Sequence, residues 1–225
     1  AAFVNLITIS MSYGDRFFVQ YFLGVDSVAV YGANYDLAEK GVIFLNSVFI
    51  LSSSASAIRL FENDGETKCI NYLSDVLFYY LAFSVSIISF VFLYAADFIK
   101  IILPETYWSG AGVILYISIS GVILGILHRF SLILTIHKRI DLNLTAGILA
   151  IILNFILCFF LIPRFGILGA AYATVLTYLF YLAATVFFAK KFMLPSISQK
   201  QIFSIILPNT LVVLLMSYLK PYVGL

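Results

Sequence analysis

The feature that most constrains the fold is a series of uncharged stretches of about 20 residues, separated by short charged segments. These stretches are residues 76–96, 106–127, 142–162, 165–189 and 201–219. A helix rises about 1.5 Å per residue, so each stretch can cross the ~30 Å hydrocarbon core of a bilayer. Residues 41–58 form a sixth such span that extends back toward residue 28, and residues 1–25 form a seventh that Asp15 and Arg16 interrupt. We therefore predict an all-α, polytopic transmembrane helix bundle of about seven spans.

Composition supports this fold class and excludes several functions. The chain is 63% hydrophobic and 11% charged, whereas soluble domains carry about 25% charged residues. A net charge of +2 without a basic stripe gives no reason to expect a nucleic-acid partner. Cys69 and Cys158 lie far apart and lack metal-ligand spacing, so we expect no metal, disulfide or cofactor. No HExxH, GxSxG or Walker motif is present, and we expect that the protein is not an enzyme.

The short connections predict an orientation in the membrane. The opening AAFVNLITIS has no basic segment and no cleavage site, so we expect a fragment that begins inside a longer protein rather than a signal peptide. One set of connections carries Arg59, Lys68, Lys138, Arg139, Lys190, Lys191 and Lys200, and the other carries Lys100, Arg164 and Lys220. Because Lys and Arg are enriched in cytoplasmic loops, we expect the first set to face the cytoplasm.

Five charged residues fall within the first two predicted spans: Asp15, Arg16, Asp36, Glu39 and Lys40. Counted from the outer ends of the two helices, all five lie about 12 to 18 Å deep, near the middle of the bilayer. Each such charge costs about 2.5–3.5 kcal/mol on insertion scales. Asp36 and Lys40 have the i,i+4 spacing of a helix ion pair, which leaves an excess acid that is typical of proton or cation relays.

Two readings of these charges remain open: a polar cavity, or a buried network that only fixes how two helices pack. Neighbouring polar groups favour the cavity, so we expect Asp15 and Arg16 to face a water-filled path. Our candidate substrate-pathway residues are Asp15, Arg16, Asn34, Tyr35, Asp36, Glu39, Lys40 and Arg129. Arg129 lies near the predicted cytoplasmic interface, where snorkelling to the surface or contact with an anionic lipid headgroup would explain it.

Small residues at helical spacing predict where helices pack closely. Gly121 and Gly125 form a GxxxG pair, and Gly169 and Ala173 repeat the same spacing in a later span. Such pairs let the backbones of two membrane helices approach each other.

The segment NFILCFFLIPRFGILGAAYATVLTY (154–178) resembles the signature of bacterial polysaccharide and lipid-linked oligosaccharide flippases of O-antigen type. DRFFVQYFLGVDSVAVYGANYDLAEK (15–40) is similar to the helix pair that opens the C-terminal half of that family, and ADFIKIILPETYWSGAGVILYI (96–117) resembles its next external connection. The family belongs to the multidrug/oligosaccharidyl-lipid/polysaccharide exporter superfamily. The resemblance implies two lobes around a central cavity, with residues 1–225 forming the C-terminal lobe and an N-terminal lobe absent.

The function that this resemblance implies is transport of an undecaprenyl-linked oligosaccharide across the bacterial inner membrane for surface polysaccharide synthesis. Expected partners are the lipid-linked substrate, membrane lipids, the N-terminal lobe of the same protein and a coupling proton or sodium ion. Arg16 and Lys40 are expected to attract the pyrophosphate linker. The alternatives are a cation-coupled drug antiporter of the same superfamily and a membrane enzyme such as an oligosaccharide polymerase.

Overall fold

A computed structural model describes residues 2–192 and 194–223 of the chain. These residues form seven α-helices and one short 3-10 helix, and no strand occurs among them. In chain order the elements are α1 (Ala2–Leu23), α2 (Val25–Asp64), α3 (Glu66–Ile102), η1 (Glu105–Gly110), α4 (Ala111–Ile136), α5 (Ile140–Phe165), α6 (Ile167–Ala189) and α7 (Gln199–Val223). The predicted all-α bundle and its number of helices are confirmed.

Six helical segments in the described part of the chain are long and apolar enough to cross a membrane. They are α2, α3, α4 together with η1, α5, α6 and the part of α7 from Gln199 to Tyr218. The chain is therefore a multi-pass membrane protein.

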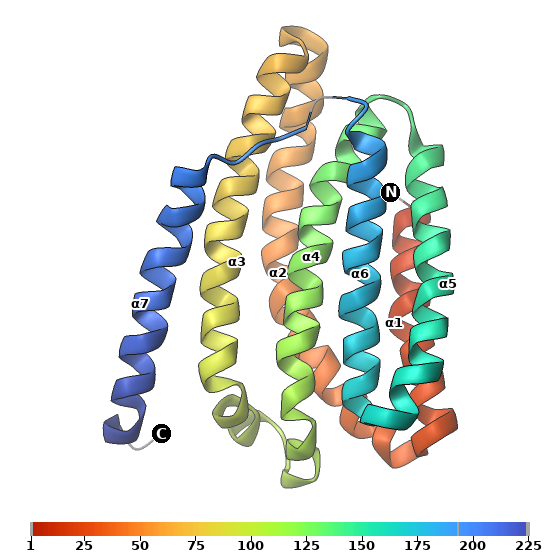
Figure 1. The fold of residues 1–225 in the computed structure, drawn as a ribbon, viewed down its shortest axis with the longest axis vertical. Helices are drawn as coiled ribbons and strands as arrows, with labels where there is room; N and C mark the ends of the chain where they lie inside the picture. The colour runs from red at the N-terminus through yellow and green to blue at the C-terminus, as the bar shows by residue number, and fades with distance from the viewer. Residues whose placement is uncertain (1, 193, 224–225) are drawn as a thin grey trace.

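The helices α2 and α3 form a hairpin that is much longer than a bilayer is thick. They contain 40 and 37 residues, which corresponds to about 60 and 55 Å. Only Gly65 separates them, with φ 88° and ψ 174°, a conformation that is essentially restricted to glycine. Figure 1 shows the tip of this hairpin rising beyond the other helices. Arg59 and Lys68, which the sequence predicts to lie in a connection, both lie on helices instead, because polar residues end a membrane span without ending a helix.

The connections alternate between the two ends of the bundle (Figure 1). Gly65, the turn between α4 and α5 and the linker between α6 and α7 lie at the upper end in this view. Gly24, η1 and Gly166 lie at the opposite end. The two sets of Lys- and Arg-bearing connections are thus at opposite ends, as predicted, and the assignment of the first set to the cytoplasm stays a prediction.

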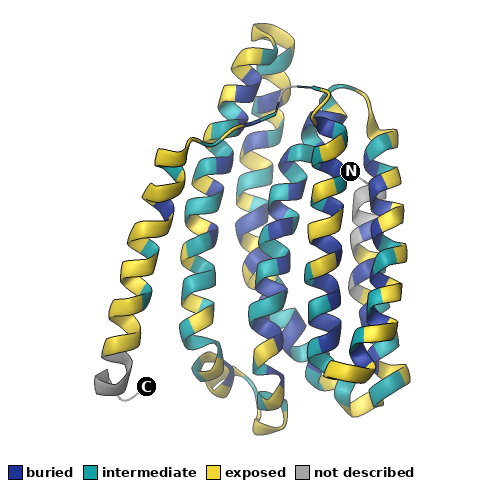
Figure 2. Cartoon of the chain, viewed as in Figure 1, coloured by how far each residue is buried: buried dark blue, intermediate teal, exposed yellow. Residues whose placement is uncertain are grey.

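The centre of the bundle is formed by α4 and α6, whereas α7 lies at its edge. Contacts join α6 to α5 and α4, α2 to α4, and α1 to α5. Figure 2 shows many buried positions along α4 and α6 and mostly exposed positions along α7, which packs against α3. In a bilayer, the exposed apolar side chains of α7, such as Phe203 and Leu211, face lipid rather than water.

Two of the predicted small-residue pairs lie where helices touch. A Cβ atom on Gly169 would come within 2.3 Å of the backbone oxygen of Leu161, so α5 and α6 pack backbone to backbone. A Cβ atom on Gly125 would lie 1.9 Å from the Tyr80 hydroxyl and 2.3 Å from Oδ1 of Asn46. These positions have room only for glycine, which confirms close packing at both.

Candidate functional site

The charged residues of α1 and α2 meet through an ion pair between Arg16 and Asp36. Their side chains are 27% and 45% exposed, so the pair lies at the surface of this bundle. The Arg16 guanidinium also lies 5.5 Å from the ring centres of Tyr13 and Tyr35, within the range of a cation–π contact. This ion pair joins charges that the sequence places at a similar depth in the first two spans.

Glu39 and Lys40 continue the charged surface along α2. Lys40 is exposed, and the described residues place no ion pair between it and Asp36, whose carboxylate contacts Arg16 instead. Glu39 is half-buried and lines a small cavity of about 30 Å³ between α2, α4 and α6. The other residues lining this cavity are Tyr35, Val42, Asn46, Ile117, Ser120, Gly121, Leu124 and Tyr178. A space of this size accommodates about one water molecule.

Asp15 faces the interior of the bundle, where it is fully buried. Thr174 Oγ1 and Tyr31 OH donate to its Oδ2 at 2.5 and 3.2 Å, and Cys158 Sγ donates to Oδ1 at 3.3 Å. The expectation that Asp15 and Arg16 face one water-filled path is therefore wrong for Asp15. Consecutive residues on a helix point about 100° apart, which is why one of them faces α5 and α6 and the other faces α2.

Asn34 and Tyr35, also predicted for the pathway, are both buried. Asn34 Nδ2 donates to the carbonyls of Val30 and Tyr107 at 2.8 and 3.0 Å, which ties η1 to α2. Tyr35 lies beside the Arg16 guanidinium and 5.6 Å from the ring of Tyr31. Tyr35 thus packs against Arg16 of the charged surface, whereas Asn34 holds η1 against α2.

Arg129 is buried and does not reach the membrane surface: its side chain is 3% exposed. Its guanidinium carbon lies 3.7 Å from the Tyr80 ring centre and 5.6 Å from that of Phe49, and Nη1 donates to the carbonyl of Gly125. The snorkelling expectation is wrong, because Tyr80 and Phe49 from α3 and α2 enclose the side chain within the bundle. Arg129 is thus separated from the surface that carries Arg16.

The sequence did not indicate the partners of Asp15 and Arg129, which are both buried. The Asp15 partners Cys158 and Thr174 come from α5 and α6, and Cys158 shares a helix face with Asn154 at i,i+4 spacing. Polar residues at this spacing within apolar spans could have indicated from the sequence where a buried carboxylate finds its hydrogen-bond donors. Tyr80 donates to Asn46 Oδ1 at 2.7 Å beside Arg129, and no spacing in the sequence indicates this pairing.

No family model matches the chain, and no curated protein matches it. The chain is similar to a solved structure described as the outward-facing conformation of a multidrug resistance MATE family transporter of the MOP superfamily. The TM-score is 0.71 at 21% sequence identity, and the match covers 96% of this chain and 51% of the other. This chain therefore shares the fold of part of that structure. It spans about half the length of the transporter that it matches.

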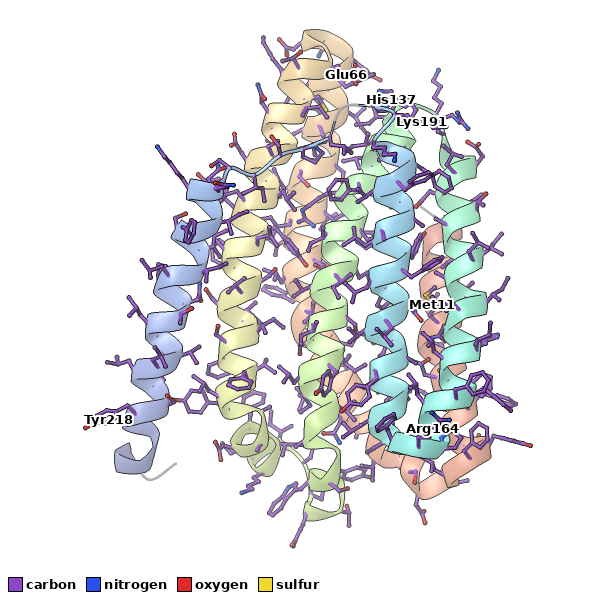
Figure 3. The ribbon with its side chains drawn as sticks, in the orientation of Figure 1. Met11, Glu66, His137, Arg164, Lys191 and Tyr218 are labelled. Carbon is purple, nitrogen blue, oxygen red and sulfur yellow. The ribbon has the colours of Figure 1, made fainter. Side chains whose placement is uncertain are left out.

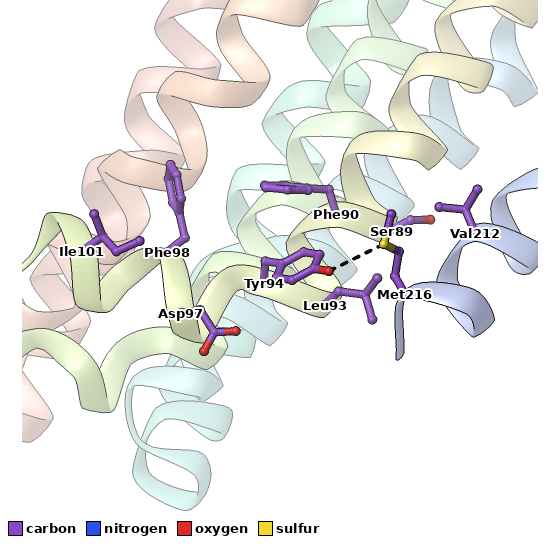
Figure 4. Close-up of a pocket in the computed structure, with 9 residues that line it drawn as sticks. All are labelled: Ser89, Phe90, Leu93, Tyr94, Asp97, Phe98, Ile101, Val212 and Met216. Carbon is purple, nitrogen blue, oxygen red and sulfur yellow. Dashed lines mark hydrogen bonds between the residues drawn. The ribbon is translucent and has the colours of Figure 1, made fainter. Parts of the chain in front are cut away.

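An apolar pocket of about 440 Å³ lies between α3 and α7 (Figure 4). Phe90, Leu93 and Phe98 line it from α3, and Val212 and Met216 line it from α7. The Tyr94 hydroxyl lies 3.8 Å from the Met216 sulfur, which is the hydrogen bond drawn in the figure. The pocket lies on different helices from the charged surface of α1 and α2, and its lining suits apolar chains.

Proposed function

We propose that this chain is the C-terminal lobe of a transporter that moves a lipid-linked oligosaccharide across the bacterial inner membrane. The observation that carries the proposal is the charged surface of α1 and α2, where Arg16, Asp36 and Lys40 lie at the edge of the bundle. The fold supports transport, because it matches about half of a known transporter. A polar surface on a membrane-spanning lobe provides a place for a headgroup that the bilayer excludes.

In this proposal Arg16 holds the anionic linker of the substrate. A guanidinium presents paired donors that match two phosphate oxygens, and aromatic faces on Tyr13 and Tyr35 restrict where it points. Asp36 neutralises Arg16 when no substrate is bound, and the phosphate replaces this carboxylate. Lys40, which is exposed, adds a second positive charge one turn from Asp36. The exposed rings of Tyr13, Phe17 and Tyr21 provide flat apolar faces on which sugar rings stack.

A second candidate, a cation-coupled antiporter for drugs or other solutes, is favoured by Asp15. This carboxylate is completely buried among hydroxyl and thiol donors, and the described residues provide no cationic partner for it. Buried intramembrane acids of this kind mark proton or cation relays. A transporter of the oligosaccharide could also be coupled to a proton or cation at Asp15. The two candidates are therefore distinguished by an experiment on the substrate rather than on the coupling.

The experiment replaces Arg16 in the full-length protein and measures membrane level and surface-polymer export separately. We expect Arg16→Ala to reach the membrane at near-normal level and to lose export. Arg16→Lys should recover only part of it, because a lysine lacks the planar, two-pronged geometry.

The matched control is Arg164→Ala, which removes an exposed arginine at the end of α5, far along the chain from the charged surface. This variant should export normally. If Arg16→Ala exports the polymer normally but loses drug efflux, the result would contradict the oligosaccharide proposal and support the antiporter. Loss of Arg16→Ala from the membrane would show that Arg16 only fixes helix packing.

A further inference from the structure

The upper end of the bundle contains a histidine that contacts four separate parts of the chain. His137 caps the end of α4, and its Nδ1 lies 2.8 Å from the carbonyl of Ile133 in the same helix. Its Nε2 lies 3.3 Å from Oε1 of Glu66, in the first turn of α3. The ring stacks on Phe192 in the linker after α6, with ring centres 4.2 Å apart, and meets the edge of Phe61 from α2 at 5.3 Å. Figure 3 shows His137, Glu66 and Lys191 at this end of the molecule.

Both nitrogens of the His137 ring have a neighbour that can accept a hydrogen bond. These neighbours are the backbone carbonyl of Ile133 at Nδ1 and the carboxylate of Glu66 at Nε2. Neutral imidazole has a single N–H, whereas the protonated ring has two and can donate to both. The arrangement therefore requires the imidazolium cation to satisfy both hydrogen bonds.

The positions of His137 and Glu66 at helix ends favour a positive charge on the histidine and a negative charge on the glutamate. A cation is stabilised at the C-terminal end of a helix, where His137 lies, and an anion is stabilised in the first turn, where Glu66 lies. The stacked ring of Phe192 adds a face on which a cation is attracted. The side chain of His137 is only 16% exposed, so its pair with Glu66 is shielded more than a surface ion pair.

The other charged groups on the surrounding elements do not replace Glu66. They are Arg59, Glu62 and Asp64 on α2, Lys68 on α3, Lys138, Arg139 and Asp141 at the turn into α5, and Lys190 and Lys191 at the end of α6. Lys68 pairs with Asp64 at 2.6 Å. Arg139 pairs with Asp141 at 3.0 Å, and Lys190 lies over the ring of Phe187. Among the described residues, Glu66 is the carboxylate within ion-pair distance of the His137 ring.

We propose that His137 and Glu66 form a pH-sensitive latch that fastens the tip of the α2–α3 hairpin to the end of α4 when His137 is protonated. Histidine is the side chain whose charge changes between about pH 5 and 8. Loss of the proton removes the attraction to Glu66 and leaves one ring nitrogen without a hydrogen to donate. The contact is therefore stable at low pH and weakens as the pH rises. Its role in a transport cycle rests on the proposed function, whereas the latch itself does not.

The test measures the distance between the hairpin tip and the start of α5 in the full-length protein in lipid nanodiscs. Spin labels attached to Asn63→Cys and Thr145→Cys occupy exposed, uncharged positions on the two sides of the latch. We expect a narrow, short distance distribution at pH 5.5 and a broader, longer one at pH 8.5. His137→Gln and Glu66→Gln should give the broad distribution at both values and lose the pH response.

Two controls make the outcome specific. His128→Gln removes the other histidine of this chain, which is on the same helix outside the latch, and should keep the full pH response. Arg16→Ala tests the proposed function and should also keep it, so a failure of transport and a failure of the latch can be told apart. An unchanged distance between pH 5.5 and 8.5, or a pH response that persists in His137→Gln, would overturn the proposal.

Discussion

Asp15 and Arg16 are neighbours in the chain, and their surroundings differ as much as two sites in one membrane protein can. Arg16 has a half-exposed carboxylate and two tyrosine rings around it, so solvent or a ligand can reach it. Asp15 accepts hydrogen bonds from Tyr31, Cys158 and Thr174 and has no exposed surface. The structure thus separates a residue suited to binding from one suited to a change in protonation or to holding a small cation.

The burial of Asp15 leads to a prediction about coupling. We expect Asp15→Asn to fold and to make transport independent of an imposed proton or sodium gradient, because the amide cannot carry the negative charge. Asp15→Ala should be less stable than Asp15→Asn, since each donor left unpaired in the core costs about 1–3 kcal/mol. Transport into proteoliposomes with and without each gradient measures the first effect, and the thermal transition of the purified variants measures the second.

The outcome against this interpretation is also specific. If Asp15→Asn still responds to the gradient as the wild type does, Asp15 is only a packing residue. Thr174→Val offers a milder comparison, because it removes the 2.5 Å hydrogen bond and keeps the charge. Gradient dependence should survive in that variant.

At the scale of elements, the sequence predicted the helices better than the connections between them. Uncharged runs predicted the helices, because the cost of charge in lipid limits where a span can lie. They did not predict that Gly24, Gly65 and Gly166 each join two helices almost alone, since a helix continues past the membrane wherever its backbone stays hydrogen-bonded. The i,i+4 spacing favoured an ion pair of Asp36 with Lys40, whereas Asp36 pairs with Arg16 on the neighbouring helix.

The side-chain directions on these elements were harder to predict. Arg129 was expected to reach the surface, because its depth in α4 is compatible with snorkelling, yet Tyr80 and Phe49 enclose it. Hydropathy gives the depth of a residue and says nothing about its rotation around the helix axis. That rotation depends on packing between helices far apart in sequence.

The contact between α5 and α6 gives a prediction about packing. Gly169→Ala should reduce the thermal stability and membrane level of the protein, because the new Cβ would lie 2.3 Å from the Leu161 backbone oxygen and the helices must separate. The control is Gly41→Ala in α2, where a Cβ meets nothing within 4 Å. There alanine should stabilise the helix by about 0.5–1 kcal/mol. Equal stability of the two variants would mean that α5 and α6 tolerate a wider spacing.

At the scale of the whole molecule, the bundle has two ends of different charge. The connections with most of the Lys and Arg lie at the end that also holds the tip of the α2–α3 hairpin and the His137 contacts. Because every connection lies at one of the two ends, the side of the membrane on which one connection lies determines the side for all the others. The cytoplasmic side is expected at the more basic end.

This orientation can be tested by labelling with a membrane-impermeant thiol reagent. We expect Glu105→Cys to label from outside intact cells and Lys138→Cys to label only after the membrane is opened. The native thiols of Cys69 and Cys158 are buried and should contribute little background. The reverse pattern would invert the topology and place the His137 latch on the external face.

The length of the α2–α3 hairpin has a mechanical consequence. Two helices about twice as long as the bilayer is thick, joined by a single residue and packed along their length, behave as a stiff rod. The part of α2 within the bundle carries Asp36, Glu39 and Lys40, and the tip of the hairpin rises beyond the other helices. If the hairpin tilts by about 10° around the level of Asp36, its tip, roughly 44 Å farther along α2, moves by about 8 Å. A small tilt near the charged residues is thereby magnified into a larger displacement at the tip of the hairpin.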